Sequence, residues 1–174
     1  MTPPIPLSIA ILTISDTRTP ETDISGQYLS TAISSAGHTL QAYQIIQDDK
    51  ESIKQQLQFL SKRPDIDVVI TTGGTGITAR DVTPEAVHEV VEMDIPGFGE
   101  LFRWISFQTI GTSTIQSRAC AGVLSGTLIF ALPGSTNACK DAWTKILVEQ
   151  LDINHKPCNF VQLLPRLANS KRKA

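Results

Sequence analysis

Apolar and polar positions along the chain alternate between the pattern of buried strands and the pattern of helices with one apolar face. Continuous runs of β-branched and other apolar residues predict strands that are covered on both faces. Three such strands are expected at residues 7–15 (LSIAILTIS), 39–46 (TLQAYQII) and 65–72 (DIDVVITT). Residues 122–134 (GVLSGTLIFALPG) predict a hairpin that turns at Ser125 and Gly126.

The segments between the strands repeat apolar residues at the spacing of one helix face. Gly37 is a typical residue just beyond a helix end, Asp49 is a typical N-cap, and Thr83 followed by Pro84 is a typical helix start. The helices expected are 25–37, 50–62, 84–92, 97–110 and 135–151. Strands that alternate with helices predict an α/β fold, with a mainly parallel sheet and helices on both faces.

Length and charge limit the classes of protein to consider. The 174 residues are enough for a single domain, 1–174, and we expect residues 168–174 to form a disordered tail. The net charge of -2 gives no reason to expect a nucleic-acid or anionic-membrane partner. The apolar runs are far shorter than the roughly 20 residues of a membrane span, and the N-terminus lacks a basic signal region.

Cysteine usage indicates a reducing compartment. Cys120, Cys139 and Cys158 contain no C-x-x-C pair, and one of the three would remain unpaired in any disulfide scheme. The three histidines are scattered among them, so no zinc cluster is predicted. We therefore expect a cytoplasmic protein without a membrane segment.

Polar loops follow four of the predicted strands. These loops are 15–18 (SDTR), 47–49 (QDD), the glycine loop 73–76 (GGTG) and 133–136 (PGST). If the four strands are parallel, all four loops lie at one edge of the sheet. Ligands of such sheets bind at this edge, where the strand order reverses.

The glycine loop lies in the sequence VVITTGGTGITARDVTPEA, residues 68–86. Glycines let backbone N–H groups approach an anion closely, and a following helix adds a favourable dipole. The Walker phosphate-binding pattern is absent, because Thr78 stands five places after Gly73 and no lysine follows it. The dinucleotide pattern matches at Gly74, Gly76 and Ala79, but on the third strand–helix turn instead of the first.

Asp81 is unexpected beside a phosphate, which it would repel. A divalent cation between the two reverses the sign of this interaction, and Mg²⁺ is typically held by one or two carboxylates together with substrate phosphates. Arg80 adds a positive group next to Asp81. The alternative is that the glycines form only a tight turn and that Asp81 opens the next helix.

The motif TTGGTGITARDVTPEA, with ILTISDTRT and DISGQYL upstream, resembles the MoaB/MogA family of molybdenum cofactor biosynthesis. The stretches PGFGELFR, IGTSTIQSRA and ALPGSTNACKDAW are similar to the MoaB branch, and the resemblance covers roughly residues 5 to 165. It implies a three-layer α/β/α sandwich around a mainly parallel, doubly wound sheet. It also implies trimers, which in the MoaB branch can pair into hexamers.

The activity that the resemblance implies is adenylylation of molybdopterin with ATP and Mg²⁺, which gives adenylyl-molybdopterin and pyrophosphate. Asp81 corresponds to the essential acid of the family motif. Asp48 corresponds to the second acid, with Asp49 as a competing alignment because the loop reads QDD. Both acids are the expected catalytic residues and Mg²⁺ ligands, and Gly73, Gly74, Thr75 and Gly76 would hold the phosphate end of the pterin or the nucleotide.

Further residues are candidates for substrate binding, and the resemblance supports this role for Asp16 and Arg18 among them. For Arg118 the alternative is an ion pair at a subunit interface, and for Ser135 it is an N-cap. The added candidates are Ser15, Asp16, Arg18, Arg80, Ser117, Arg118, Gly134 and Ser135.

Three functions remain open from the sequence. The first is the adenylyltransferase. Some MoaB-type members have lost the two acids, whereas this chain keeps Arg80 and Asp81 of the motif, which favours a competent site. The second is a protein that binds molybdopterin without turnover, and the third is a dinucleotide-binding oxidoreductase. Neither the metal of the pathway, molybdenum or tungsten, nor other pathway proteins as partners can be chosen from the sequence.

The predicted helix 97–110 has more apolar residues than one buried face needs. An exposed aromatic patch usually marks an interface. We therefore expect a closed homo-oligomer, a trimer or hexamer, with Phe102 or Trp104 at a subunit contact. The alternative is that the apolar segment Cys158–Leu167 covers this helix in the same chain. His38 is expected to be solvated, and Trp143 to lie in the core or an interface.

Overall fold

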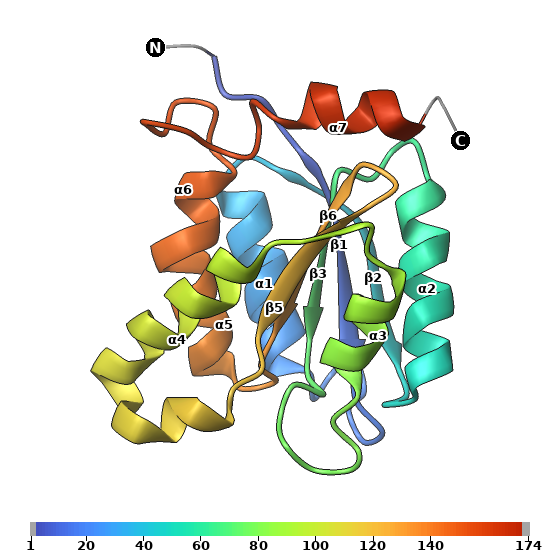
Figure 1. The fold of residues 1–174 in the computed structure, drawn as a ribbon, viewed down its shortest axis with the longest axis vertical. Helices are drawn as coiled ribbons and strands as arrows, with labels where there is room; N and C mark the ends of the chain where they lie inside the picture. Colours follow the sequence, from blue (N-terminus) through green and yellow to red (C-terminus); the bar gives the residue numbers. More distant parts are fainter. Residues whose placement is uncertain (1–2, 172–174) are drawn as a thin grey trace.

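The structure is a computed structural model that describes residues 3–171, with side chains up to residue 167. A six-stranded sheet forms its centre, and helices cover both faces (Figure 1). The strands are β1 Ser8–Ile14, β2 Thr39–Ile46, β3 Val68–Thr72, β4 Met93–Asp94, β5 Cys120–Leu124 and β6 Thr127–Leu132. The helices are α1 Ile24–Ser35, α2 Lys50–Lys62, α3 Thr83–Val90, α4 Pro96–Ile110, α5 Thr136–Ala142, α6 Val148–Gln150 and α7 Leu164–Lys171.

The strand order is β2-β1-β3-β6-β5-β4. The strands β2, β1, β3 and β6 run parallel, whereas β5 and β4 are antiparallel to their neighbours. The predicted hairpin is β5–β6, and its two turn residues, Ser125 and Gly126, have φ values of 48° and 74°. Positive φ at both positions is what a tight hairpin turn of this hand requires. The mainly parallel sheet and the hairpin are thus confirmed.

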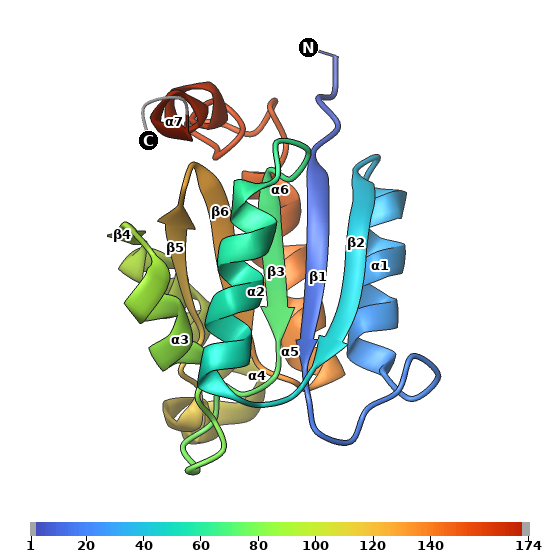
Figure 2. The same ribbon diagram turned by 90° about the vertical axis from the view of Figure 1, so that its right-hand side faces the viewer.

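Successive residues of each central strand point to opposite faces of the sheet. In β1, Ile9 and Ile11 pack into the apolar cluster under α1, α4 and α5, whereas Ala10 and Leu12 pack into the cluster under α2 and α3. Figure 2 shows α2 on one side of the strands and α5 on the other. This arrangement is the expected three-layer α/β/α sandwich.

Several local expectations differ from the structure. Val82, and not Thr83, occupies the N-cap position of α3, and the Thr83 hydroxyl donates to the Gly73 carbonyl instead (3.0 Å). A 3-10 segment, η1 (Gly111–Gln116), and a π-helical segment between α5 and α6, η2 (Trp143–Leu147), were not foreseen. At the C-terminus α7 continues to Lys171, so its backbone is helical where the disordered tail was expected to begin; residues 172–174 lie outside the described part.

The carboxyl ends of the four parallel strands lie at one edge of the sheet, at the bottom of Figure 2. From β1 the chain passes through α1 to β2, and from β3 it passes through α3 toward the opposite side of the sheet. The strand order therefore reverses between β1 and β3, which is where ligands of doubly wound sheets bind. In residues 3–171 no helix has both the length and the apolar composition needed to cross a bilayer.

His38 is partly buried, whereas the sequence predicted a solvated side chain. Its ring lies edge-on against Trp143, with ring centroids 6.4 Å apart, and its Nδ1 accepts a hydrogen bond from the Leu7 N–H at 3.2 Å. Burial lowers the pKa of His38, and the nearby Asp152 opposes this shift only in part. Trp143 itself is buried in the core.

This environment predicts a pH dependence of stability. Because the pKa of His38 is lower in the folded state than in the unfolded state, the unfolded chain binds the proton first as the pH falls. The free energy of unfolding should therefore drop by about 1 kcal/mol, the scale of one hydrogen bond, as the pH falls from about 6.5 through the folded pKa. Urea unfolding at a series of pH values measures this.

The matched control is His38→Asn, which keeps a hydrogen-bond acceptor near the Leu7 N–H but does not titrate. Stability of this variant should not show the His38 step. Identical pH profiles for wild type and variant would contradict the assignment.

Candidate functional site

The glycine loop packs directly on the ends of β1 and β6, the two strands that flank β3. Gly73 has a φ of 106°, and a Cβ at this position would lie only 2.2 Å from the carbonyl oxygen of Ile14 at the end of β1. The Gly73 N–H donates to the Leu132 carbonyl of β6 at 3.0 Å. Only glycine combines this backbone conformation with this close approach. The loop is thereby held in the crevice where the strand order reverses.

The remaining loop residues bring the backbone next to the predicted acids. A Cβ at Gly74 (φ 64°) would lie 2.3 Å from the Thr83 hydroxyl and 2.9 Å from Oδ1 of Asp48. A Cβ at Gly76 would lie 2.7 Å from Oδ2 of Asp81. Thr75 is only 3% exposed as a whole residue, so this predicted binding residue is buried in the structure.

Asp81 is held in a short loop of its own. Its Oδ2 accepts hydrogen bonds from the Thr78 N–H (2.9 Å) and the Thr78 hydroxyl (2.6 Å). Desolvation raises the pKa of Asp81, but the hydrogen bonds from Thr78 and from the Gly76 N–H, together with Arg118, outweigh it and leave the pKa below its usual value. Asp81 is therefore an anion at neutral pH.

Asp48 has the opposite electrostatic environment. Desolvation raises its pKa, and the negative charges of Asp81 and Asp16 raise it further, against the lowering effects of the Val82 N–H and Arg80. Its Oδ1 is buried and accepts no hydrogen bond from any residue in the described part of the chain. A buried carboxylate oxygen without a donor, next to a second carboxylate, fits a position for a cation.

The neighbouring Asp49 has a different role. Its carboxylate accepts a hydrogen bond from the Ser52 N–H at 2.8 Å and caps α2, as the sequence predicts. Of the two acids in the QDD loop, Asp48 is therefore the one that lies beside the glycine loop. The assignment of Asp48 as a catalytic residue itself stays a prediction.

Asp16 connects three loops of this edge. One oxygen of its carboxylate forms an ion pair with Arg80 of the loop after β3, and the other accepts the N–H of Asp48 in the loop after β2 at 3.2 Å. Arg80 is largely exposed, so its guanidinium can also reach a ligand from solvent. The structure thus brings Asp16, Asp48, Arg80 and Asp81 together with the glycines.

A separate small pocket of about 260 Å³ opens beside the glycine loop, between the ends of β1 and β6. Four of the predicted residues line it: Ser15, Arg18, Gly73 and Gly134. The candidates Ser117 and Ser135 do not line it: Ser117 accepts the Ala119 N–H, and Ser135 caps α5 by accepting the Ala138 N–H at 3.2 Å. For Ser135 this is the N-cap alternative.

The sequence reasoning missed a buried acid in this pocket. Asp23 accepts hydrogen bonds from the hydroxyls of Thr13 and Tyr43, both at 2.6 Å, and caps α1 through the Gly26 N–H at 2.9 Å. Burial and the neighbouring Asp23 raise the pKa of Tyr43. The signal that was available is an aspartate immediately before ISGQYL, the start of a helix with an apolar face.

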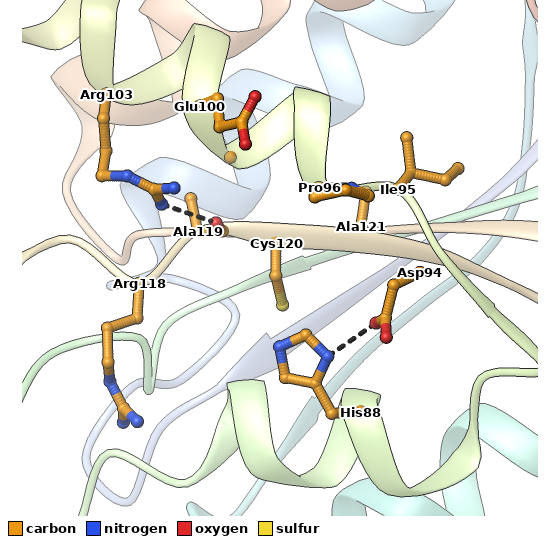
Figure 3. A pocket seen from close by; sticks show the side chains of 11 residues that line it. His88, Asp94, Ile95, Pro96, Glu100, Arg103, Arg118, Ala119, Cys120 and Ala121 are labelled. Atoms are coloured by element: carbon orange, nitrogen blue, oxygen red, sulfur yellow. Dashed lines mark hydrogen bonds and ion pairs between the residues drawn. The ribbon is translucent and has the colours of Figure 1, made fainter.

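Another pocket, of about 410 Å³, lies between α3, α4 and the edge strands (Figure 3). His88 and Asp94 meet there through Nδ1 and Oδ1 at 2.6 Å. None of the glycine-loop residues 73–76 lines this pocket. Arg118 borders it, but its side chain extends away from Glu100 and Arg103 in Figure 3.

The model of the family described as "Probable molybdopterin binding domain" matches residues 10–153 of the chain. Over 156 residues the chain is 48% identical to Molybdenum cofactor biosynthesis protein B of Escherichia coli, which covers 90% of this chain and 92% of that protein. It is 51% identical over 142 residues to the protein of the same name from Bacillus anthracis (81% and 84%).

Solved structures agree with these relatives. A crystal structure of a Molybdenum cofactor biosynthesis protein B matches with a TM-score of 0.82 at 41% identity and covers 98% of this chain and 99% of that one. The tungsten cofactor synthesizing protein MoaB from Pyrococcus furiosus matches with a TM-score of 0.77 at 31% identity (94% and 98%). The fold is therefore that of the α/β domain described as a probable molybdopterin binding domain. The chain belongs to the MoaB/MogA family of molybdenum cofactor biosynthesis proteins.

Proposed function

We propose that this protein acts in molybdenum cofactor biosynthesis as an adenylyltransferase that transfers AMP from ATP to molybdopterin and releases pyrophosphate. The names of the relatives support the pathway. The observation that carries the reaction type is the buried Oδ1 of Asp48, without a hydrogen-bond donor and close enough to Asp81 for the negative charge of Asp81 to raise the pKa of Asp48. Two acids placed in this way at a glycine loop suit phosphate groups only when a cation lies between them.

Mg²⁺ fits this donor set, and Asp48 and Asp81 are the residues that would hold it. Within residues 3–171 no group of three or more His, Cys, Asp or Glu side chains could bind a metal ion by itself. A site with few protein ligands is typical of Mg²⁺, which completes its coordination with water and substrate phosphates. When bound, Mg²⁺ would neutralise negative charge on the phosphates of ATP.

The reaction needs positioning more than proton transfer. An oxygen of the terminal phosphate of molybdopterin attacks the α-phosphorus of ATP, a new P–O bond forms, and the bond to pyrophosphate breaks. A phosphate is already a nucleophile at neutral pH, so no general base is required. The glycine loop allows close approach of both phosphates to the backbone, and the exposed Arg80 supplies positive charge beside them.

Pyrophosphate release tests this proposal against the non-catalytic alternative. Wild-type protein mixed with molybdopterin and MgATP should release one pyrophosphate for each molybdopterin consumed. Binding of both ligands without pyrophosphate would leave a binding protein of the same pathway. Titration calorimetry with NAD is the control for the oxidoreductase, since only that function predicts binding of NAD without Mg²⁺.

We also propose that the protein is a closed homo-oligomer, a trimer or a hexamer. Five apolar side chains of α4 and η1 are exposed, and the C-terminal segment does not cover them, because Phe160 packs on Phe130 of β6 instead. The five are Leu101, Trp104, Phe107, Ile110 and Ile115. Phe102 is only 1% exposed and lies in the core of its own chain, so it was the wrong candidate for a subunit contact.

Trp104→Glu should therefore reduce the oligomer mass. Trp104 is 64% exposed on α4, and a charge there would be buried unpaired in any interface formed by this face. Light scattering at micromolar concentration should show an oligomer for the wild type and smaller species for the variant. The matched control is Phe59→Glu on α2, an aromatic residue of similar exposure in the opposite layer, which should leave the mass unchanged. A wild-type monomer would contradict the proposal.

A further inference from the structure

Arg118 contacts the glycine loop and the segment that follows it through their backbone carbonyls. It lies in the short link between η1 and β5, and its backbone N–H donates to the Thr75 carbonyl at 3.0 Å. Its guanidinium donates through Nε to the Gly76 carbonyl (2.6 Å) and through Nη2 to the Asp81 carbonyl (2.5 Å). Nη1 forms an ion pair with Glu85 of α3. One residue thus joins the beginning of the loop, its end and the next helix.

Two of the three carbonyls that Arg118 binds, those of Thr75 and Asp81, belong to peptide groups whose N–H faces an acid. In a planar trans peptide the carbonyl of one residue and the N–H of the next point in opposite directions. The Thr75 carbonyl is therefore rigidly paired with the Gly76 N–H, and the Asp81 carbonyl with the Val82 N–H. The Gly76 N–H interacts with the carboxylate of Asp81, and the Val82 N–H with the carboxylate of Asp48. The backbone N–H of Arg118 holds the Thr75–Gly76 peptide group and its guanidinium holds the Asp81–Val82 peptide group, and an acid lies at the other end of each.

We propose that Arg118 is a positioning residue that fixes Asp48 and Asp81 relative to each other by holding the peptide groups that face them. The sequence suggested a contact with a substrate anion or an ion pair between subunits. Neither role is needed to explain the geometry, because Nε, Nη1 and Nη2 are each engaged within the same chain. The negative charge of Glu85 also neutralises the positive charge of Arg118 that would attract a substrate anion.

The catalytic consequence of this inference rests on the proposed function, but its structural part does not. If Arg118 fixes the loop, removing its side chain frees the carbonyls of Gly76 and Asp81 and lets the Asp81–Val82 peptide group, whose N–H faces Asp48, turn. The distance between the acids would then vary, and the pair would bind a cation less well. A loss of preorganisation of this kind lowers the rate of the bound complex more than it weakens substrate binding.

Hydrogen exchange, followed by mass spectrometry, tests the structural part on the whole protein. In Arg118→Gln the amides of residues 76–82 should exchange about tenfold faster or more, while those of β1 and β3 stay as in the wild type. Arg118→Lys should behave in the same way, since one ammonium group cannot span two carbonyls and a carboxylate. The control Glu85→Gln removes only the ion pair and should leave exchange in 76–82 close to that of the wild type.

Kinetics test the catalytic part. Both Arg118 variants should lower kcat by about tenfold or more and raise the Mg²⁺ concentration for half-maximal rate, with little change in the KM for molybdopterin. A direct anion contact predicts the reverse: a higher KM, and substantial rescue by lysine. That pattern would overturn the positioning role. So would unchanged exchange in residues 76–82, or an equal increase in β1 and β3, which would indicate a general packing role. Absence of pyrophosphate release by the wild type would refute the proposed function and leave the exchange result standing.

Discussion

Asp81→Asn is expected to lower the rate of molybdopterin adenylylation by about 100-fold or more, the usual scale for the loss of one preorganised electrostatic group. The pKa of Asp81 lies below its usual value, so the wild-type side chain brings a full negative charge to the glycine loop. Asparagine removes that charge and keeps an oxygen that can accept from the Thr78 N–H. Pyrophosphate release at saturating MgATP measures the effect.

Folding of the Asp81→Asn variant provides the control. Its melting temperature should stay close to that of the wild type, because Thr78 retains an acceptor and α3 begins with Val82 as its N-cap. An unchanged rate would rule out the role in cation binding. A variant that loses its fold would instead support the alternative in which Asp81 mainly shapes the start of α3.

Asp48→Asn is expected to lower the rate by about 10- to 100-fold and to raise the Mg²⁺ concentration needed for half-maximal rate. The same change should not lower stability. Because desolvation and the neighbouring Asp81 and Asp16 raise the pKa of Asp48, its ionised form is less favourable in the folded protein than in the unfolded chain. Removal of the charge relieves this cost, so activity falls while the melting temperature holds or rises.

The matched control is Asp49→Asn in the same loop. Asparagine is as good an N-cap as aspartate, so α2 should remain capped and both rate and Mg²⁺ requirement should stay near wild type. If Asp49→Asn lowers the rate and Asp48→Asn does not, the second acid of the site is Asp49, and the geometry around Gly74 has been misinterpreted.

Much of the fold follows from local patterns in the sequence. Runs such as SIAILTI and VVITT are apolar on both faces, which predicts central parallel strands, and Ser125–Gly126 between two apolar runs predicts the β5–β6 turn. The two-residue strand β4 is too short to give a pattern. The N-cap of α3 is Val82, one residue before the predicted Thr83. The Thr83 hydroxyl binds the Gly73 carbonyl instead, a contact that only the folded loop brings about.

In the candidate site too, some features can be predicted from the sequence and others only from the fold. Asp81 and the glycines are adjacent in sequence, so their association is visible as a motif. Asp48, Asp16 and Arg118 come from other loops, and their relation to the motif depends on strand order and on backbone directions. The role of Arg118 in binding the carbonyls of Gly76 and Asp81 cannot be derived from residue type, since an arginine is equally suited to an anion or to a carboxylate.

The central claim is that Asp48 and Asp81 together hold a divalent cation at the glycine loop. The most direct measurement is the binding of Mn²⁺ with ATP, followed by the electron paramagnetic resonance signal of free Mn²⁺, for the wild type and for the Asp48→Asn, Asp81→Asn and Asp49→Asn variants. The two-acid site predicts affinities about 10- to 100-fold weaker for Asp48→Asn and Asp81→Asn, and an affinity equal to wild type for Asp49→Asn. Equal Mn²⁺ affinity in all four proteins would contradict it.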